Sequence, residues 1–177
     1  MSAPLGRRIV CLSAAALVSG CGFQPVYMPT ASGKPGPAAR EMQTVNVPVI
    51  PDRPGQLLRQ ALQERLGSDA GAPAAYDLRV SFGISGEGIA VQQNNISTRV
   101  RLIGIAVWTL QERNPQQTPL TTGSARSFDA VNVFDEQYFA SDLETEAVQK
   151  RIAEAVAQQI ATQLAVWFRE RAAKQSS

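Results

Sequence analysis

The stretch "TRVRLIGIAVWTLQE", residues 98–112, has the pattern of one strand that is apolar on both of its faces. One face carries Ile103, Ile105 and Val107. The other face carries Leu102, Ala106, Trp108 and Leu110. A strand of this kind needs cover on both sides of its sheet. Helices of the same chain supply one cover, and the second comes either from the same domain or from a partner; the pattern leaves both alternatives open.

Two further strands flank this stretch. Residues 76–85 alternate cleanly between an apolar and a polar face, and the apolar face consists of Tyr76, Leu78, Val80, Phe82 and Ile84. The polar segment "VQQNNIS", residues 91–97, has the composition of a turn between the two strands. Residues 120–134 form a third strand, which Gly123 weakens by interrupting it. The sequence therefore predicts a meander of three strands.

Two segments have the spacing of amphipathic helices. Residues 51–67 place leucines at helical intervals, with Pro54 in the first turn and Gly67 as the stop signal. Residues 142–173 form the longest element, which begins at a capping box of Ser141 and Glu144. Its apolar stripe consists of Leu143, Val148, Ile152, Val156, Ile160, Leu164 and Trp167. We expect this helix to pack across the sheet.

A short strand precedes the first helix. Within residues 42–50, Val45, Val47 and Val49 alternate with polar residues, and Pro48 indicates an edge or a bulge. The element order is then strand, helix, three strands, helix. This order predicts an α+β fold, a two-layer sandwich in which two helices pack on one face of a mixed sheet.

The N-terminus has the pattern of a secretory signal. Arg7 and Arg8 precede an apolar run over residues 9–18, which is about half as long as the roughly 20 residues that a spanning helix needs. The run ends at Val18-Ser19-Gly20-Cys21, which fits a bacterial lipobox. The sequence thus predicts a signal peptide over residues 1–20 and a lipidated, palmitate-bearing Cys21.

The alternative for Cys21 is an unmodified thiol. An internal disulfide is excluded in the mature chain, because the other cysteine, Cys11, lies in the segment predicted to be removed. Two or more acyl chains hold a protein stably on a membrane, whereas one chain does not. Gly22, which follows the cysteine, favours the outer membrane over the inner one under the sorting rule of Gram-negative lipoproteins. Residues 21–40, rich in Pro, Gly, Ser and Ala, are expected to form a flexible tether, and residues 41–177 the domain.

Composition excludes several function classes. Without Arg7 and Arg8 the 17 basic residues become 15, against 15 acidic ones, so the mature chain has no excess charge for nucleic-acid binding. The chain has no histidine, which excludes a Ser-His-Asp or Cys-His catalytic group and the commonest metal ligand. We expect no cofactor, no metal and no catalytic residue.

The start "CGFQPVY" and the element order together resemble the LPS-assembly lipoprotein family LptE, also called RlpB-like. Its form C-G-F-x-P-x-Y, here Cys21, Gly22, Phe23, Pro25 and Tyr27, looks like that of α-proteobacterial members. The resemblance implies a protein without enzymatic activity on the periplasmic side of the outer membrane. In that family the domain plugs the β-barrel LptD, helps it to fold and contributes to the transport of lipopolysaccharide to the outer leaflet.

Four arginines are candidate contacts with lipopolysaccharide. Arg99 and Arg101 begin the central strand on one face, and Arg79 and Arg126 lie near them if the strands pair in order. Clustered guanidinium groups suit bidentate contacts with phosphates, such as those of lipid A. The alternative is that they are ordinary solvated charges. No Lys or Arg occurs between Gly86 and Thr98 or from Ser127 to Gln149, so the predicted loop tips carry no basic residue.

Two rival functions are left open. An enzyme would have to use Asp142, Glu144 or Glu146, but capping and the helix dipole already explain acidic residues at a helix start. A lipoprotein pilot or scaffold of another envelope complex would share the anchor and the small domain. Identifying the protein that is captured with the tagged chain distinguishes this rival.

Overall fold

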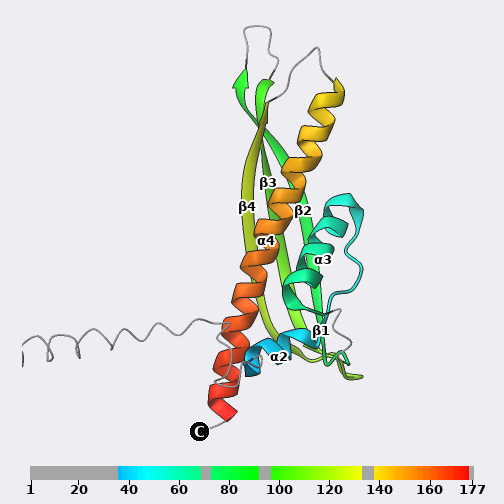
Figure 1. Ribbon diagram of the computed structural model, residues 1–177, viewed down its shortest axis with the longest axis vertical. Helices are drawn as coiled ribbons and strands as arrows, with labels where there is room; N and C mark the ends of the chain where they lie inside the picture. The colour runs from blue at the N-terminus through cyan, green and yellow to red at the C-terminus, as the bar shows by residue number, and fades with distance from the viewer. Residues whose placement is uncertain (1–35, 69–72, 92–96, 133–137, 176–177) are drawn as a thin grey trace, which may run out of the picture.

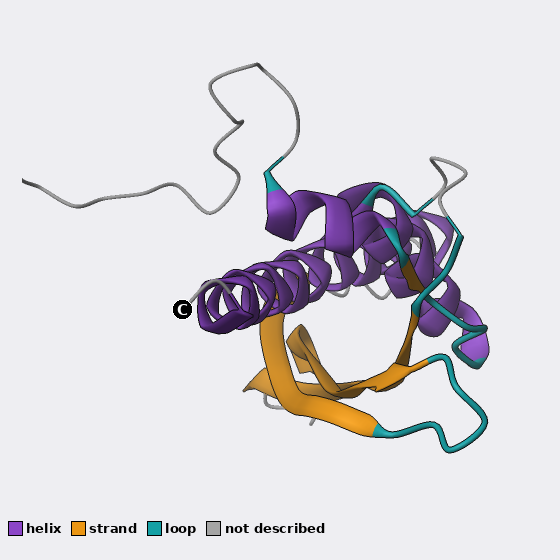
Figure 2. Ribbon diagram, turned by 90° about the horizontal axis from the view of Figure 1, so that it is seen from below, coloured by secondary structure: helices purple, strands orange, loops and turns teal. Residues whose placement is uncertain are grey.

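The computed structural model describes residues 36–68, 73–91, 97–132 and 138–175. They form two layers (Figures 1 and 2), a curved sheet with helices on one of its faces. The elements, in order, are α2 (Pro37–Gln43), β1 (Val45–Asn46), α3 (Asp52–Leu66), β2 (Tyr76–Val91), β3 (Ser97–Glu112), β4 (Pro119–Asn132) and α4 (Tyr138–Gln175). The predicted α+β sandwich is confirmed, with α2 as an additional helix.

The sheet has the order β1-β2-β3-β4. β1 pairs with β2 in parallel, whereas β2, β3 and β4 form an antiparallel meander, so the sheet is mixed. The register sets Phe82 opposite Ala106 and Ala106 opposite Ala125. Even-numbered residues of β2 and β3 therefore lie on one face of the sheet, and odd-numbered residues lie on the other.

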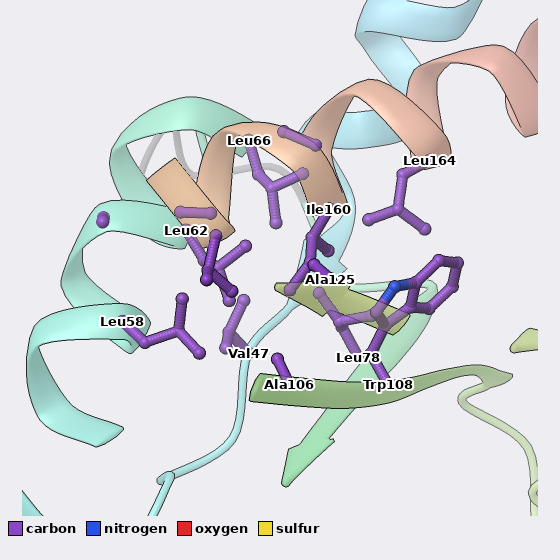
Figure 3. Close-up of a cluster of buried hydrophobic side chains, with 14 of the residues drawn as sticks. Val47, Leu58, Leu62, Leu66, Leu78, Ala106, Trp108, Ala125, Ile160 and Leu164 are labelled. Atoms are coloured by element: carbon purple, nitrogen blue, oxygen red, sulfur yellow. The ribbon is translucent and has the colours of Figure 1, made fainter. Parts of the chain in front are cut away.

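The core lies between the sheet and the helices. Val47, Leu58 and Leu62 meet Leu78, Ala106 and Trp108 in one cluster with residues of α4 (Figure 3). α4 has 38 residues, which corresponds to a length of about 57 Å. Its buried stripe consists of Val148, Ile152, Ala153, Val156, Ala157, Ile160, Ala161, Leu164, Ala165 and Phe168. This stripe covers the helix-facing side of β3 and β4 and also contacts α3.

Two glycines allow α4 and the core to approach the sheet closely. A Cβ on Gly104 would lie 2.4 Å from Cγ2 of Ile152. A Cβ on Gly123 would lie 2.5 Å from the indole ring of Trp108. The expectation that Gly123 weakens the third strand is wrong, because β4 runs through this position without a break and the indole fills the space.

The structure corrects the predicted start of the domain. α2 begins at Pro37, and Ala38 and Met42 are buried, so residues 37–40 belong to the folded domain and not to a tether. Proline suits this position because the first helical N–H has no partner within the helix. The hydroxyl of Tyr76 donates to Glu41 at 3.0 Å, which fastens α2 to the sheet. The signal peptide, Cys21 and the rest of the tether lie outside the described residues.

The first strand is shorter than expected. β1 ends at Asn46, and Val49 is 73% exposed while Val45 and Val47 are buried, so the three valines do not share one face. Pro48 has no N–H to continue the ladder, and the chain leaves the sheet there.

The capping box predicted for the long helix is also wrong. α4 begins at Tyr138, so Ser141 lies inside the helix and is not its N-cap. Leu143, which was expected in the buried stripe, is 71% exposed. The S-x-x-E pattern is local, and it does not tell whether the helix already began one turn earlier.

Candidate functional site

The two apolar faces of β3 have different environments. Leu102, Ala106, Trp108 and Leu110 point to the helices and are buried. The indole N–H of Trp108 also donates to Oε1 of Gln163 on α4 at 3.1 Å. Ile103, Ile105 and Val107 point to the other side of the sheet, which no described helix covers (Figure 2). The domain itself therefore covers only one face of β3.

The uncovered side carries an apolar cluster that we call the outer patch, consisting of Ile103, Ile105, Val107 and Phe128. Phe128 lies directly opposite Ile103 in the register. Ile105, Val107 and Phe128 are 49%, 57% and 67% exposed. Small polar residues border the patch, since Ser81 and Ser124 lie opposite Val107 on the two neighbouring strands. Contiguous exposed apolar side chains with a polar border are typical of interaction sites.

Two of the four predicted arginines adjoin the outer patch. Arg101 and Arg126 line a shallow cleft of about 340 Å³ together with Ile103 and Phe128. The guanidinium of Arg101 lies 5.8 Å from the centroid of the Phe128 ring and 3.9 Å from a carboxylate oxygen of Glu87. The cleft thus combines an apolar floor with two cations.

The other two arginines share this side of the sheet but lie farther away. Arg79 is opposite Thr109 in the register, so it lies about 26 Å along the sheet from Arg101. Its guanidinium donates to Gln117 at 2.8 Å. Arg99 is two residues from Arg101 and lies opposite Asn132. Arg101 and Arg126 thus line one cleft, and Arg79 lies outside it.

The helix layer has a different surface. Its outward side chains are mostly polar, and several form ion pairs, such as Arg53 on α3 with Glu146 on α4. Arg151 on α4 donates to Asp129 on β4 at 2.8 Å. Partial burial opposes ionisation of Asp129, but the hydrogen bonds from Arg151 and from the Ala130 N–H outweigh it and lower the pKa of this carboxyl. The pair of Arg151 and Asp129 links α4 to the sheet, whereas the pair of Arg53 and Glu146 links the two helices.

The acidic residues considered for catalysis do not form an acid-base site. Glu146 is paired with Arg53, and Asp142 and Glu144 are exposed on α4. Among residues 36–68, 73–91, 97–132 and 138–175, no group of His, Cys, Asp and Glu is arranged to hold a metal ion.

Phe128 is the site residue that the sequence reasoning missed. The sequence contained the information, because Phe128 lies two residues after Arg126 and so shares its face of the strand. Arg126 had been predicted to lie near Arg101. Gln159 and Gln163 of α4 form hydrogen bonds with the β4 backbone at Arg126 and Ser124, and these contacts were not anticipated either.

No helix in the described part of the chain combines the length and the apolar character needed to span a membrane. The fold resembles several solved structures. A protein provisionally described as a lipoprotein from Caulobacter crescentus CB15 superposes with a TM-score of 0.62 at 22% identity, covering 74% of this chain and 95% of the other. The rare lipoprotein B from Shewanella oneidensis gives a TM-score of 0.51 at 12% identity, covering 75% and 97%. At these identities the likeness concerns the fold alone.

A comparison with curated protein sequences found no match. Residues 42–164, which include β1, α3, the whole meander and most of α4, match the family LptE, described as Lipopolysaccharide-assembly. This match spans well over half of the chain. The chain therefore belongs to the LptE family of lipopolysaccharide-assembly proteins.

Proposed function

We propose that this chain is a lipid-anchored protein on the periplasmic side of the outer membrane, where it partners an LptD-type β-barrel that inserts lipopolysaccharide into the outer leaflet. Its role is that of a plug and assembly factor, without catalysis. The observation that carries this proposal is the outer patch, which lies on the face of the sheet that the helices leave uncovered.

The composition of this face supports a protein partner. Its centre is apolar and includes one aromatic ring, whereas Ser81, Ser124 and Arg126 surround it. An apolar centre with a polar rim is the usual anatomy of a protein interface. Family membership supports an outer-membrane barrel as this partner, because the matching family is described as acting in lipopolysaccharide assembly.

A charge in the outer patch should therefore abolish binding to the barrel. Val107→Asp places a carboxylate at a position that the partner would bury, where an unpaired charge is costly. We expect the tagged full-length variant to be exported and folded but to recover no barrel from detergent-solubilised membranes. Gln158→Asp, on the exposed side of α4, is the matched control and should recover as much barrel as wild type. Undiminished recovery with Val107→Asp would contradict the proposal.

The same capture of partners with the tagged protein distinguishes the proposed function from the second candidate function. A pilot or scaffold of another envelope complex would bring down a secretin or a peptidoglycan enzyme with wild-type protein. A large heat-modifiable barrel supports the LptD-type partnership.

We further propose that the cleft of Arg101 and Arg126 contacts phosphate groups of lipopolysaccharide. Charge-assisted hydrogen bonds contribute about 1.5–3 kcal/mol each, so Arg101→Gln with Arg126→Gln should weaken binding of purified lipopolysaccharide at least roughly tenfold. Arg79→Gln serves as the control, because Arg79 lies outside this cleft. Equal affinities of the double variant and wild type would assign these arginines to the solvated surface.

Lipidation is proposed at Cys21. Metabolic labelling with a palmitate analogue should mark the wild type and leave Cys21→Ser unlabelled. The labelled protein should fractionate with the outer membrane. A labelled serine variant, or wild type in the inner-membrane fraction, would overturn the anchor.

A further inference from the structure

The two edges of the sheet are protected to different degrees. On the β4 edge, Nε2 of Gln159 donates to the carbonyl of Arg126 at 3.0 Å, and Oε1 of Gln159 accepts from the Arg126 N–H at 3.2 Å. Nε2 of Gln163 donates to the carbonyl of Ser124 at 3.0 Å. These two side chains of α4 occupy backbone groups that an added strand would need.

The β2 edge lacks such cover over most of its length. β1 pairs only with Tyr76 and Asp77 and lies beside the lower end of β2 (Figure 1). The Tyr76 N–H donates to the carbonyl of Thr44, which shows that the backbone groups of Tyr76 face this edge. Backbone direction alternates along a strand, so the groups of alternate residues face the same way.

Beyond Val80, the backbone N–H and C=O groups that face this edge belong to Phe82, Ile84 and Gly86. Within the segments that the structure describes, no other backbone forms hydrogen bonds with them on the open side. An edge of this kind is a template for strand addition unless proline, charge or a covering element blocks it. Residues 80–86, "VSFGISG", contain neither proline nor charge.

We propose that residues 82–86 of β2 receive an extended segment of the outer-membrane barrel partner as an additional strand. This inference rests on the proposed function. Only an extended polypeptide offers donors and acceptors at the spacing of a strand, so the occupant is a protein segment. Phe82 and Ile84 are half-buried on the helix side of the edge, whereas Ser81 and Ser85 are exposed on the other side. The added segment is therefore expected to alternate between apolar and polar side chains.

Two observations favour the barrel protein over a second copy of this chain. Gly83 lies opposite Ile105 in the register, so the open edge adjoins the outer patch and one partner can cover both. Residues 48–50 lie beside residues 77–80 of β2, which limits self-pairing to the part of the edge beyond Val80. Edge pairing of so few residues between two copies buries far less than the roughly 1,200 Å² of a stable interface, whereas a barrel that also covers the outer patch adds the area that the short pairing lacks.

Amide hydrogen exchange tests the pairing one residue at a time. We expect the amides of Phe82, Ile84 and Gly86 to exchange roughly tenfold more slowly in the complex of full-length protein and barrel than in the free protein. Neighbouring amides, which already donate to β3, form the internal control and should change much less: Ser81, Gly83 and Ser85.

A proline substitution gives an independent readout. Gly86→Pro removes the outward N–H, and an edge strand tolerates proline at such a position. Gly86→Ala adds a similar Cβ, 3.3 Å from Cγ1 of Val100, but keeps the N–H. Both variants should melt alike, and only the proline variant should recover several-fold less barrel.

The outcomes are separable. Strand addition is overturned if both sets of amides are protected equally in the complex, or if neither set is protected. The proposed function still stands in that case, provided that wild type recovers the barrel. If the amides of Phe82, Ile84 and Gly86 are already protected without the barrel, and the free protein has twice the mass of one chain, the edge pairs with a second copy. If wild type recovers no barrel at all, the proposed function and this inference both fall.

Discussion

Trp108→Asp is expected to unfold the domain, whereas Val107→Asp, one residue earlier, leaves its melting temperature nearly unchanged. Trp108 is 3% exposed, and its ring packs between the sheet and α4 (Figure 3). The substitution loses about 3–5 kcal/mol of packing and also buries an unpaired charge, enough to lower the melting temperature by more than about 10 °C. Thermal melts followed by far-UV circular dichroism measure both variants.

The comparison is informative because both positions are apolar and adjacent. Trp108→Phe is the matched control, since it keeps most of the packing but loses the hydrogen bond to Gln163. We expect it to be destabilised by only about 1 kcal/mol. If Val107→Asp unfolds the free protein as completely as Trp108→Asp does, the outer patch is part of the core and the assignment of the two faces is wrong.

The second large effect concerns Gly104. A methyl group at this position would lie 2.4 Å from Cγ2 of Ile152 and 3.2 Å from the ring of Phe82, so Gly104→Ala forces α4 away from β3. Overpacking of this kind costs about 2 kcal/mol, or roughly 6 °C in melting temperature for a domain of this size. Urea denaturation followed by tryptophan fluorescence measures the change in the free energy of unfolding.

Gly83→Ala provides the control on the neighbouring strand. A Cβ on Gly83 meets no atom within 4 Å, so this variant should be as stable as wild type or slightly more stable. Ile152→Leu removes the offending Cγ2 at nearly constant volume and should restore part of the stability lost in Gly104→Ala. A double variant whose loss equals the sum of the single losses would show that the two positions are not in contact.

The sequence predicts most of this fold because its strands carry strong alternation. The pattern from Tyr76 to Ile84 identified the helix-facing side of β2 correctly, and the order of the meander placed Arg101 and Arg126 on one face. The two faces of β3 could not be ranked, because both are apolar and only the position of α4 decides which one is buried. The role of the arginines in binding stays a prediction.

The errors have local causes. Pro48 ended β1 before Val49, although the valine alternation continues beyond it. Ser141 and Glu144 have the spacing of a cap, yet α4 begins one turn upstream, at Tyr138. The composition of residues 21–40 suggested a tether, but Met42 anchors a short helix that includes the last four of them.

The span of α4 determines how the domain moves as a body. This one helix contacts α2, α3, β3 and β4, so neither layer can bend without distorting it. A push on either end of the sheet is therefore transmitted as rotation of the whole domain. The described domain is therefore expected to act as a rigid rod, and its tilt is set wherever its outer face is held.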